Sequence, residues 1–319
     1  MDTISHIAVS TLTGQTARSI YKGRIILWFC LLAGVFPDID NIAGLWGIEA
    51  YLRYHRGITH SFIGGLLLSL ILVAIFRFSI KSFPFIKGFG LAYLMFALHI
   101  FLDLITSYGT QIFLPFTDHR YTFNSVFIID PIYTITIIIM FILSVIFFKR
   151  RMIIGIVGII WIFSYPVINF SIKNMLDYQI KNNIIEAGVN FKSIHILPDF
   201  LSPIFWKVII DQESYYHMAG INMFHLDKTL ELKGFSKADK SLLQELAKKD
   251  SFFNTYLWFS TYLVMEKRPS NIGVNMIIYD LKYASTVPLL KKRFINLPPF
   301  SLTLLFNQEG LLYNYNVRH

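Results

Sequence analysis

The side chains in this sequence best suited to chemistry are imidazoles and carboxylates that lie beside strongly apolar segments. They are His6, Asp38, Asp40, His55, His60, His99 and Asp103, with Arg56 among them. Ionisable groups next to long apolar runs are costly to bury and tend to serve a function. Nitrogen and oxygen donors without sulfur suit zinc, manganese or iron. The sequence therefore predicts a metal site.

Two pairs have spacings that favour a shared ion. His99 and Asp103 are four residues apart, so a helix projects both from one face. Asp38 and Asp40 follow Pro37 closely, and such a carboxylate pair is repulsive unless a cation lies between its members. Taken singly, the first pair could be a buried hydrogen bond and the second could be two solvated acids after a helix end.

His55 and His60 are five residues apart, which is a poor spacing for one helical face. Gly57 permits a bend that aims both rings at one point, although each could also be an ordinary histidine at the membrane interface. His6 joins the set only if the chain topology brings it to the same side. Seven ligands exceed the needs of one tetrahedral ion, so we expect two or three ions, with zinc preferred and manganese or iron possible.

The composition is typical of a membrane protein. Hydrophobic residues make up 54% of the 319 residues and charged residues 15%. The net charge of +9 arises from Lys and Arg at the ends of apolar blocks, which suits a membrane protein better than a nucleic-acid surface. Cys30 is the only cysteine, which excludes an internal disulfide and a thiolate cluster. The first residues lack the features of a secretory signal, so we expect them to be retained.

The apolar residues are concentrated in the first part of the chain and predict a polytopic helical bundle of about six short helices. The runs are residues 6–21, 25–36, 61–76, 89–105, 131–148 and 153–170. If each run crosses an inner membrane once, three basic clusters share one side, which the positive-inside rule makes cytoplasmic. These clusters are Lys22 with Arg24, Arg77 with Lys81 and Lys87, and Lys149 to Arg151. The metal site, both termini and the C-terminal region are then extracytoplasmic.

Residues 171–319 have the pattern of a soluble α+β domain, so we expect a domain boundary near residue 170. Residues 205–211, 215–224 and 272–283 read as strands, and 300–306 with 311–317 as a hairpin. Ser236 and Asp239 open a helix that runs to about Lys249. We expect helices over one antiparallel sheet.

Several of the motifs resemble one protein family. They are His6, Phe36-Pro37-Asp38-Ile39-Asp40, His55-Arg56-Gly57-Ile58-Thr59-His60-Ser61, His99-x-x-x-Asp103, Ser107-Tyr108-Gly109-Thr110 and Pro115-Phe116. Through them, residues 1–170 resemble the YdjM/YbcI/YfhP type of membrane-bound, metal-dependent hydrolase. The C-terminal region is similar only to the longer members. The order of ligands is also distantly similar to the zinc-dependent phospholipase C and nuclease P1 group. The resemblance implies a zinc-dependent hydrolase and leaves the substrate open.

These observations predict a hydrolase that acts on a phosphoester of a lipid or lipid-linked substrate. A bound divalent cation lowers the pKa of a coordinated water to about 7 and so supplies hydroxide at neutral pH. Asp38 or Asp40 would take the proton, and Arg56 with the metal ions would neutralise charge on a phosphoryl oxygen. We expect the C-terminal domain to cover the site and select the headgroup. We expect no nucleic-acid partner, and no protein partner can be named.

Two other functions stay open at this level. One is a non-catalytic metal-binding membrane protein, either a scaffold or a sensor. The other is a metal-dependent membrane amidase or peptidase, although the sequence lacks the His-Glu-x-x-His helix of zinc peptidases. We expect structural roles for the remaining polar candidates. They are Thr59 and Ser61 as helix caps, Arg120, Asp130, buried Cys30, and the histidines His195, His217 and His225.

Overall fold

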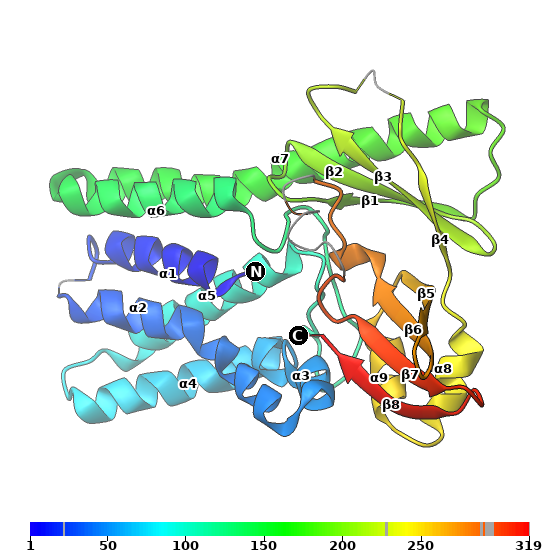
Figure 1. The fold of residues 1–319 in the computed structure, drawn as a ribbon. Helices are drawn as coiled ribbons and strands as arrows, with labels where there is room; N and C mark the ends of the chain where they lie inside the picture. The colour runs from blue at the N-terminus through cyan, green and yellow to red at the C-terminus, as the bar shows by residue number, and fades with distance from the viewer. Residues whose placement is uncertain (22, 227–228, 288–289, 291–296, 319) are drawn as a thin grey trace. The chain divides into compact units, whose positions relative to one another are not determined.

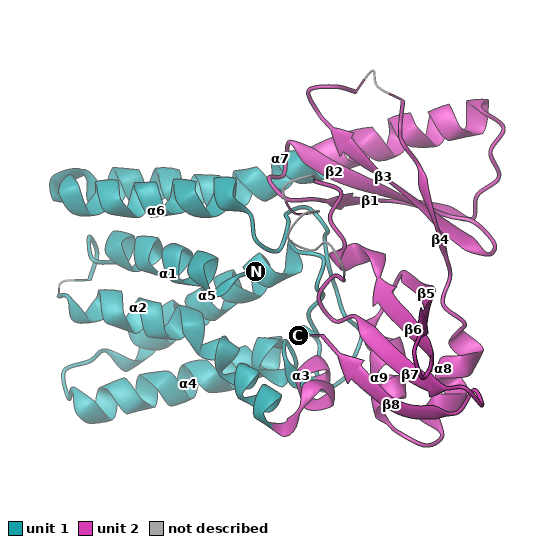
Figure 2. Ribbon diagram, in the orientation of Figure 1, with its two compact units in different colours: residues 1–45, 54–171 teal, residues 46–53, 172–319 magenta. Residues whose placement is uncertain are grey.

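The computed structural model describes the chain except residues 22, 227–228, 288–289, 291–296 and 319 (Figure 1). Lys22, which the sequence places in a basic cluster, lies outside the described residues. The described chain forms two compact units (Figure 2). Unit 1 contains residues 1–45 and 54–171, and unit 2 contains residues 46–53 and 172–319. Unit 2 thus takes in the C-terminal region and one short segment from within the N-terminal half of the sequence.

Unit 1 is a bundle of helices. Its elements are α1 (Thr3–Ala17), α2 (Ile25–Val35), η1 (Phe36–Trp46), η2 (Ile58–His60), α4 (Phe62–Ser79), α5 (Phe85–Leu104), α6 (Pro131–Ile146), η3 (Phe148–Arg150) and the first part of α7 (Arg151–Glu186). Helix α1 packs against α2 and α6, and α5 packs against α2 and α4. Leu12, Phe29, Val73 and Met95 belong to the apolar core that these helices share. Each of the six predicted apolar runs overlaps one of the helices α1, α2, α4, α5, α6 and α7, which confirms the helical bundle.

Four helical stretches of the described chain are long and apolar enough to cross a membrane. They are Ile25–Trp46, Phe62–Ser79, Phe85–Leu104 and Phe148–Glu186. Helix α6 is also apolar, but it is shorter. An 18-residue helix is about 27 Å long at about 1.5 Å per residue, close to the hydrocarbon thickness of a bilayer of about 30 Å. Large apolar side chains such as Phe78 and Ile86 are exposed on these stretches, as expected where lipid is the solvent.

Helix α7 differs from the prediction. We expected its apolar run to end at Phe170 and strands to follow, but the helix continues to Glu186. The prediction was wrong because polar residues after Ser171 break the apolar run without breaking the helix. Leu176, Ile180 and Ile184 recur every four residues, and this stripe packs against a sheet of unit 2. The last turns of α7 therefore form part of the soluble unit.

Unit 2 contains two antiparallel sheets of four strands each, in the orders β1-β2-β3-β4 and β5-β6-β7-β8. The strands are β1 (Ser193–Pro198), β2 (Phe205–Asp211), β3 (Tyr215–Asn222), β4 (Lys233–Ser236), β5 (Leu263–Ser270), β6 (Gly273–Asp280), β7 (Leu302–Asn307) and β8 (Leu312–Val317). The remaining elements are α3 (Ile48–Tyr54), whose first six residues lie in this unit, α8 (Lys240–Ala247), α9 (Phe252–Phe259) and η4 (Leu281–Tyr283). Apolar side chains of both sheets, including Ile209, Met218 and Ile277, share a core.

The predicted antiparallel α+β character is confirmed, but the single sheet is wrong because there are two. Strand β2 has the predicted bounds, and the bounds of β3, β7 and β8 lie within one or two residues of the prediction. The predicted strand 272–283 is too long, because β6 ends at Asp280 and η4 follows. Asp239 caps α8 by accepting hydrogen bonds from the backbone of Ser241 and Leu242, as its position predicted. Strand β5, with the sequence LVMEKRPS, was missed because its second half is polar and contains a proline.

Candidate metal centre

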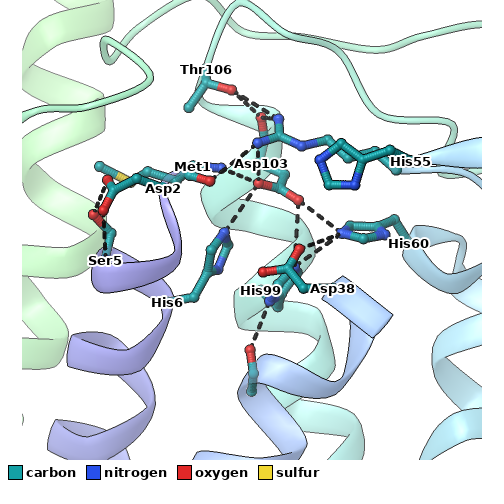
Figure 3. A network of polar contacts seen from close by, with 12 residues as sticks. Met1, Asp2, Ser5, His6, Asp38, His55, His60, His99, Asp103 and Thr106 are labelled. Atoms are coloured by element: carbon teal, nitrogen blue, oxygen red, sulfur yellow. Dashed lines mark hydrogen bonds and ion pairs between the residues drawn. The ribbon is translucent and has the colours of Figure 1, made fainter. Parts of the chain in front are cut away.

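Four segments of unit 1 bring the predicted ligands together (Figure 3). His6 lies on α1, Asp38 and Asp40 on η1, His60 at the end of η2, and His99 and Asp103 on α5. His55 lies between α3 and η2. His6, His60, His99 and Asp103 are each at most 1% exposed. The spacing of His99 and Asp103 places both on the face of α5 that meets this cluster, as predicted.

Three donor atoms of the cluster, from His60, His99 and Asp103, lie at the separations of a tetrahedral metal site, and an oxygen of Asp38 lies beside them. We call these three residues the tetrahedral group. His60 Nε2 lies 3.0 Å from His99 Nε2, 3.2 Å from Asp103 Oδ2 and 3.6 Å from Asp38 Oδ1. His99 Nε2 lies 3.5 Å from each of the same two carboxylate oxygens. A tetrahedral zinc site with bonds of about 2.1 Å has ligand atoms about 3.4 Å apart. The donor atoms therefore need little rearrangement to hold such an ion.

Hydrogen bonds at the other ring nitrogens orient both imidazoles toward this point. His99 Nδ1 donates to the carbonyl of Gly34 at 2.7 Å. His60 Nδ1 lies 2.9 Å from the Thr59 hydroxyl, which itself donates to Asp40, and 3.0 Å from Asp40 Oδ2, so this nitrogen carries a proton and donates. Each Nε2 atom is then left with its lone pair facing the cluster, and this is the arrangement of metal-binding histidines. The Gly34 carbonyl has no signature in the sequence, because only the fold brings it to His99.

The centre of the cluster favours positive charge. Two imidazole lone pairs 3.0 Å apart repel unless a proton or a metal ion lies between them. Asp103 Oδ2 lies 3.2 Å from His60 Nε2 and accepts a hydrogen bond only when that nitrogen is protonated. Burial disfavours protonated His60, but hydrogen bonds to Asp103, Asp38 and Asp40 outweigh it and raise the pKa of His60 to about 10. A divalent cation would satisfy the same lone pairs and carboxylates together.

Asp40 lies behind the tetrahedral group and organises the loop that carries His60. It accepts hydrogen bonds from His55 Nδ1 and the Arg56 backbone N–H, both at 2.9 Å, and from the Thr59 hydroxyl at 2.6 Å, besides its contact with His60. The prediction that Thr59 caps a helix is therefore wrong, because its hydroxyl is used by Asp40. Ser61 is the cap of α4, as predicted, and accepts from the Gly64 N–H.

The remaining predicted ligands form two further groups, which share Asp38 with each other. His6, Asp38 and His99 place ligand atoms within 4.8 Å of one another, as do Asp38, Asp40 and His55. The His6 ring stacks on that of His99 with centroids 3.8 Å apart, and its Nε2 lies 3.2 Å from Asp103 Oδ1. All seven predicted ligands are thus brought together, with Asp38 common to two of the three groups.

Arg56 is buried and directed at Asp103. Its guanidinium lies 2.8 Å from Asp103 Oδ1 and donates to the Thr106 hydroxyl at 3.2 Å. The ring of Tyr108 lies against it at 4.6 Å. The α-amino group of Met1 also contacts Asp103 Oδ1. One oxygen of Asp103 is therefore paired with the Arg56 guanidinium, while the other faces the imidazole nitrogens of His60 and His99.

The residues set aside in the sequence have structural roles. Asp130 caps α6 and accepts from the Tyr165 hydroxyl at 3.0 Å. Arg120 donates to the carbonyls of Tyr108 and Gly109. His195, His217 and His225 belong to unit 2, and among the described residues none of them joins a group that could hold a metal ion.

Comparison with known proteins places the N-terminal half in a family. A family model described as YdjM inner membrane protein matches residues 1–176, a range that contains all seven predicted ligands and Arg56. The chain is 28% identical over 138 residues to a Bacillus subtilis (strain 168) protein called uncharacterized protein YfhP. That alignment covers 41% of this chain and 42% of YfhP, so the chain spans less than half of this relative's length. No solved structure matches the chain.

Proposed function

The chain belongs to the YdjM inner membrane protein family, and from its site we propose that it is a membrane-bound, metal-dependent hydrolase. The observation that carries the proposal is the convergence of donor atoms from His60, His99 and Asp103, with an oxygen of Asp38 3.6 Å from the first imidazole nitrogen and 3.5 Å from the second. Three protein ligands would leave the fourth position of a tetrahedral ion open for water. The lone pairs and carboxylates that meet there need a cation. Among hydrolases, such a cation activates water and polarises the bond that is broken.

The donor set favours zinc. Two imidazole nitrogens and two carboxylate oxygens suit zinc, and manganese or iron are the alternatives. The groups that contain His6 and His55 lie beside the tetrahedral group and share Asp38 with each other. A carboxylate can bridge two ions, so these groups are the places for a second and third ion.

The surrounding residues divide into three roles in this proposal. Asp38 is the proton acceptor, because its side chain is the more exposed of the two carboxylates, at 14% against 7% for Asp40. The Asp40 carboxylate already accepts hydrogen bonds from the 55–60 loop. Asp40 orients His60. Arg56 contacts the ligand Asp103 directly and holds it in place. The predicted action of Arg56 on a phosphoryl oxygen stays a prediction.

The substrate class follows from the surface next to the site. Ile39, Ile42 and Leu45 are between 52% and 81% exposed on η1, the element that carries Asp38 and Asp40. Phe116, on a loop of the same unit, is 82% exposed. In a membrane protein such side chains contact lipid, so an amphiphile can reach η1 from the bilayer. We therefore propose a phosphoester of a lipid or lipid-linked molecule as the substrate.

The orientation of the protein is part of the proposal. The basic residues Arg24, Arg77, Lys81, Lys87 and 149–151 lie in the connections after α1, α4 and α6 or in the helix turns next to them. The positive-inside rule places these connections in the cytoplasm. The ligands come from the opposite ends of the same helices, so we propose that the site and residues 171–319 are extracytoplasmic.

The test combines metal analysis with headgroup release. The purified full chain should contain zinc, manganese or iron and release headgroups from at least one member of a panel of phospholipids and lipid-linked phosphates. Asp38→Asn should abolish release, whereas Asp118→Asn, at an exposed acid of unit 1, should not. Metal in the wild-type chain without release of any headgroup would support a scaffold whose ions tie four segments together. Release of an amine from an amide substrate instead would support an amidase.

A further inference from the structure

Helix α3 lies in the sequence between two of the ligand-bearing stretches, yet its first six residues belong to unit 2. The chain leaves unit 1 after Leu45 and returns at Tyr54, one residue before His55. Asp40 accepts hydrogen bonds from His55 and Arg56 and so closes the base of this excursion within unit 1. The tip of the excursion, residues 46–53, belongs to unit 2.

The residues that hold the tip lie on one face of α9. Ser251, at the start of α9, and Thr255 donate to the two carboxylate oxygens of Glu49 at 3.2 and 3.1 Å. The guanidinium carbon of Arg53 lies over the ring of Trp258, 5.3 Å from its centroid. Positions 251, 255 and 258 are spaced by four and three residues, so they form one stripe on the helix.

Helix α3 presents a matching stripe. Glu49 and Arg53 are four residues apart, so both side chains project from one face, and Leu52 beside them is completely buried. The rings of Tyr51 and Phe300 are stacked, with centroids 6.4 Å apart. A seven-residue helix is too short to be stable alone, so its conformation depends on these contacts with unit 2.

We infer that Glu49 and Arg53 are positioning residues through which unit 2 sets the order of the His55–His60 loop and thereby the affinity of the metal site. The inference rests on the proposed function only in treating His55 and His60 as metal ligands. Arg53 lies two residues before His55, so a loosened α3 frees the backbone that places His55, Arg56 and His60. The C-terminal unit then has a role in metal binding, besides the headgroup selection that the sequence led us to expect.

The experiment measures hydrogen exchange in the full chain, in lipid nanodiscs and without added metal. The amides of Arg56, Gly57, His60 and Ser61 are hydrogen-bonded in the described structure, so peptide 54–61 reports the order of the loop. Ser251→Ala/Thr255→Val removes both donors to Glu49 at positions distant in sequence from the ligands. We expect exchange in peptide 54–61 to rise about tenfold, the effect of losing about one hydrogen bond to a charged group. Zinc affinity should fall several-fold in the same chain.

Asn254→Ala is the matched control, because Asn254 is an exposed residue of the same helix. It should leave exchange and zinc affinity unchanged, and peptide 205–211 of β2 should stay protected in every variant. If exchange also rises in peptide 205–211, the double variant disturbs unit 2 as a whole. Exchange of peptide 54–61 is then measured in Arg53→Met, and this second variant decides the inference. Exchange of peptide 54–61 within twofold of wild type in that deciding variant would overturn the inference. A wild-type chain that binds zinc but hydrolyses nothing would overturn the hydrolase and leave this inference standing.

Discussion

Both units bury charged side chains, but the two networks are built differently. In unit 2, Lys207 is completely buried and donates to the carbonyls of Leu281, Lys282 and Ala284. Asp199 accepts from the Ser285 hydroxyl and from the backbone and hydroxyl of Thr286. Donors and acceptors are matched in this network, so it needs no further group.

The network in unit 1 has an excess of acceptors. His60 and His99 use their Nδ1 atoms on Asp40 and Gly34 and direct lone pairs at each other and at two carboxylates. A buried cluster of this kind is stabilised by a proton or a metal ion at its centre. The comparison teaches that burial of charge alone does not identify a functional site. The diagnostic feature is the surplus of lone pairs that converge on one point.

The largest expected effect comes from breaking the unit 1 network. His60→Ala removes one donor of the tetrahedral group, so we expect loss of at least one metal ion per chain and a fall in hydrolysis of about 10³-fold, which corresponds to several kcal/mol of lost charge stabilisation. Metal content and headgroup release measure these effects. His217→Ala, at a histidine of β3, is the control and should retain both. Full metal content in His60→Ala would contradict the assignment of the site.

The second effect concerns the unit 2 network. Lys207→Met leaves three buried carbonyls without their donor and should lower the free energy of unfolding of unit 2 by about 3 kcal/mol. Hydrogen exchange of peptide 205–211 against urea measures this change. Lys267→Met, at an exposed lysine of β5, is the control. Metal content should not change in either variant, and a loss of metal in Lys207→Met would break the contrast between the networks.

The same lysine gives unit 2 a pH dependence. Burial, opposed by the charges of Asp199 and Asp280, lowers the pKa of Lys207 from 10.5 to about 8. Between these values the unfolded chain binds a proton that the folded chain does not, so the free energy of unfolding rises with pH above about 8. From pH 8 to 10 we expect a gain of up to about 3 kcal/mol in wild type relative to Lys207→Met. Parallel pH profiles for the two chains would contradict this linkage.

The difference between the networks also explains what the sequence could predict. His99 and Asp103 could be paired from their spacing because both lie on one helix, and His6 could be included from the topology of the bundle. The roles of Asp40 and Gly34 could not, because they depend on the path of the 55–60 loop and on a backbone carbonyl of α2. Lys207 carried no signal at all, since its partners are main-chain atoms more than 70 residues away.

In the C-terminal region, short β-type runs predicted β2, which is buried on both faces, and the β7–β8 hairpin, in which β7 alternates buried and half-buried residues. It did not predict that residues 46–53 join that unit. Contacts between Glu49 and the hydroxyls of Ser251 and Thr255 link positions about 200 residues apart and are made by side chains that occur on any polar surface.

The smallest effect separates a ligand from a residue that orients a ligand. Asp40→Asn keeps the shape of the side chain but removes the charge that faces His60 Nδ1 and makes its Nε2 a better donor to metal. We expect zinc affinity to fall about tenfold with the metal count unchanged, as for other partners of ligating histidines. Competition with a zinc chelator measures the affinity, with Asp118→Asn as control. Loss of an ion, as in His60→Ala, would instead place Asp40 in direct contact with metal, since only a missing donor, and not a weakened one, empties a site at saturating zinc.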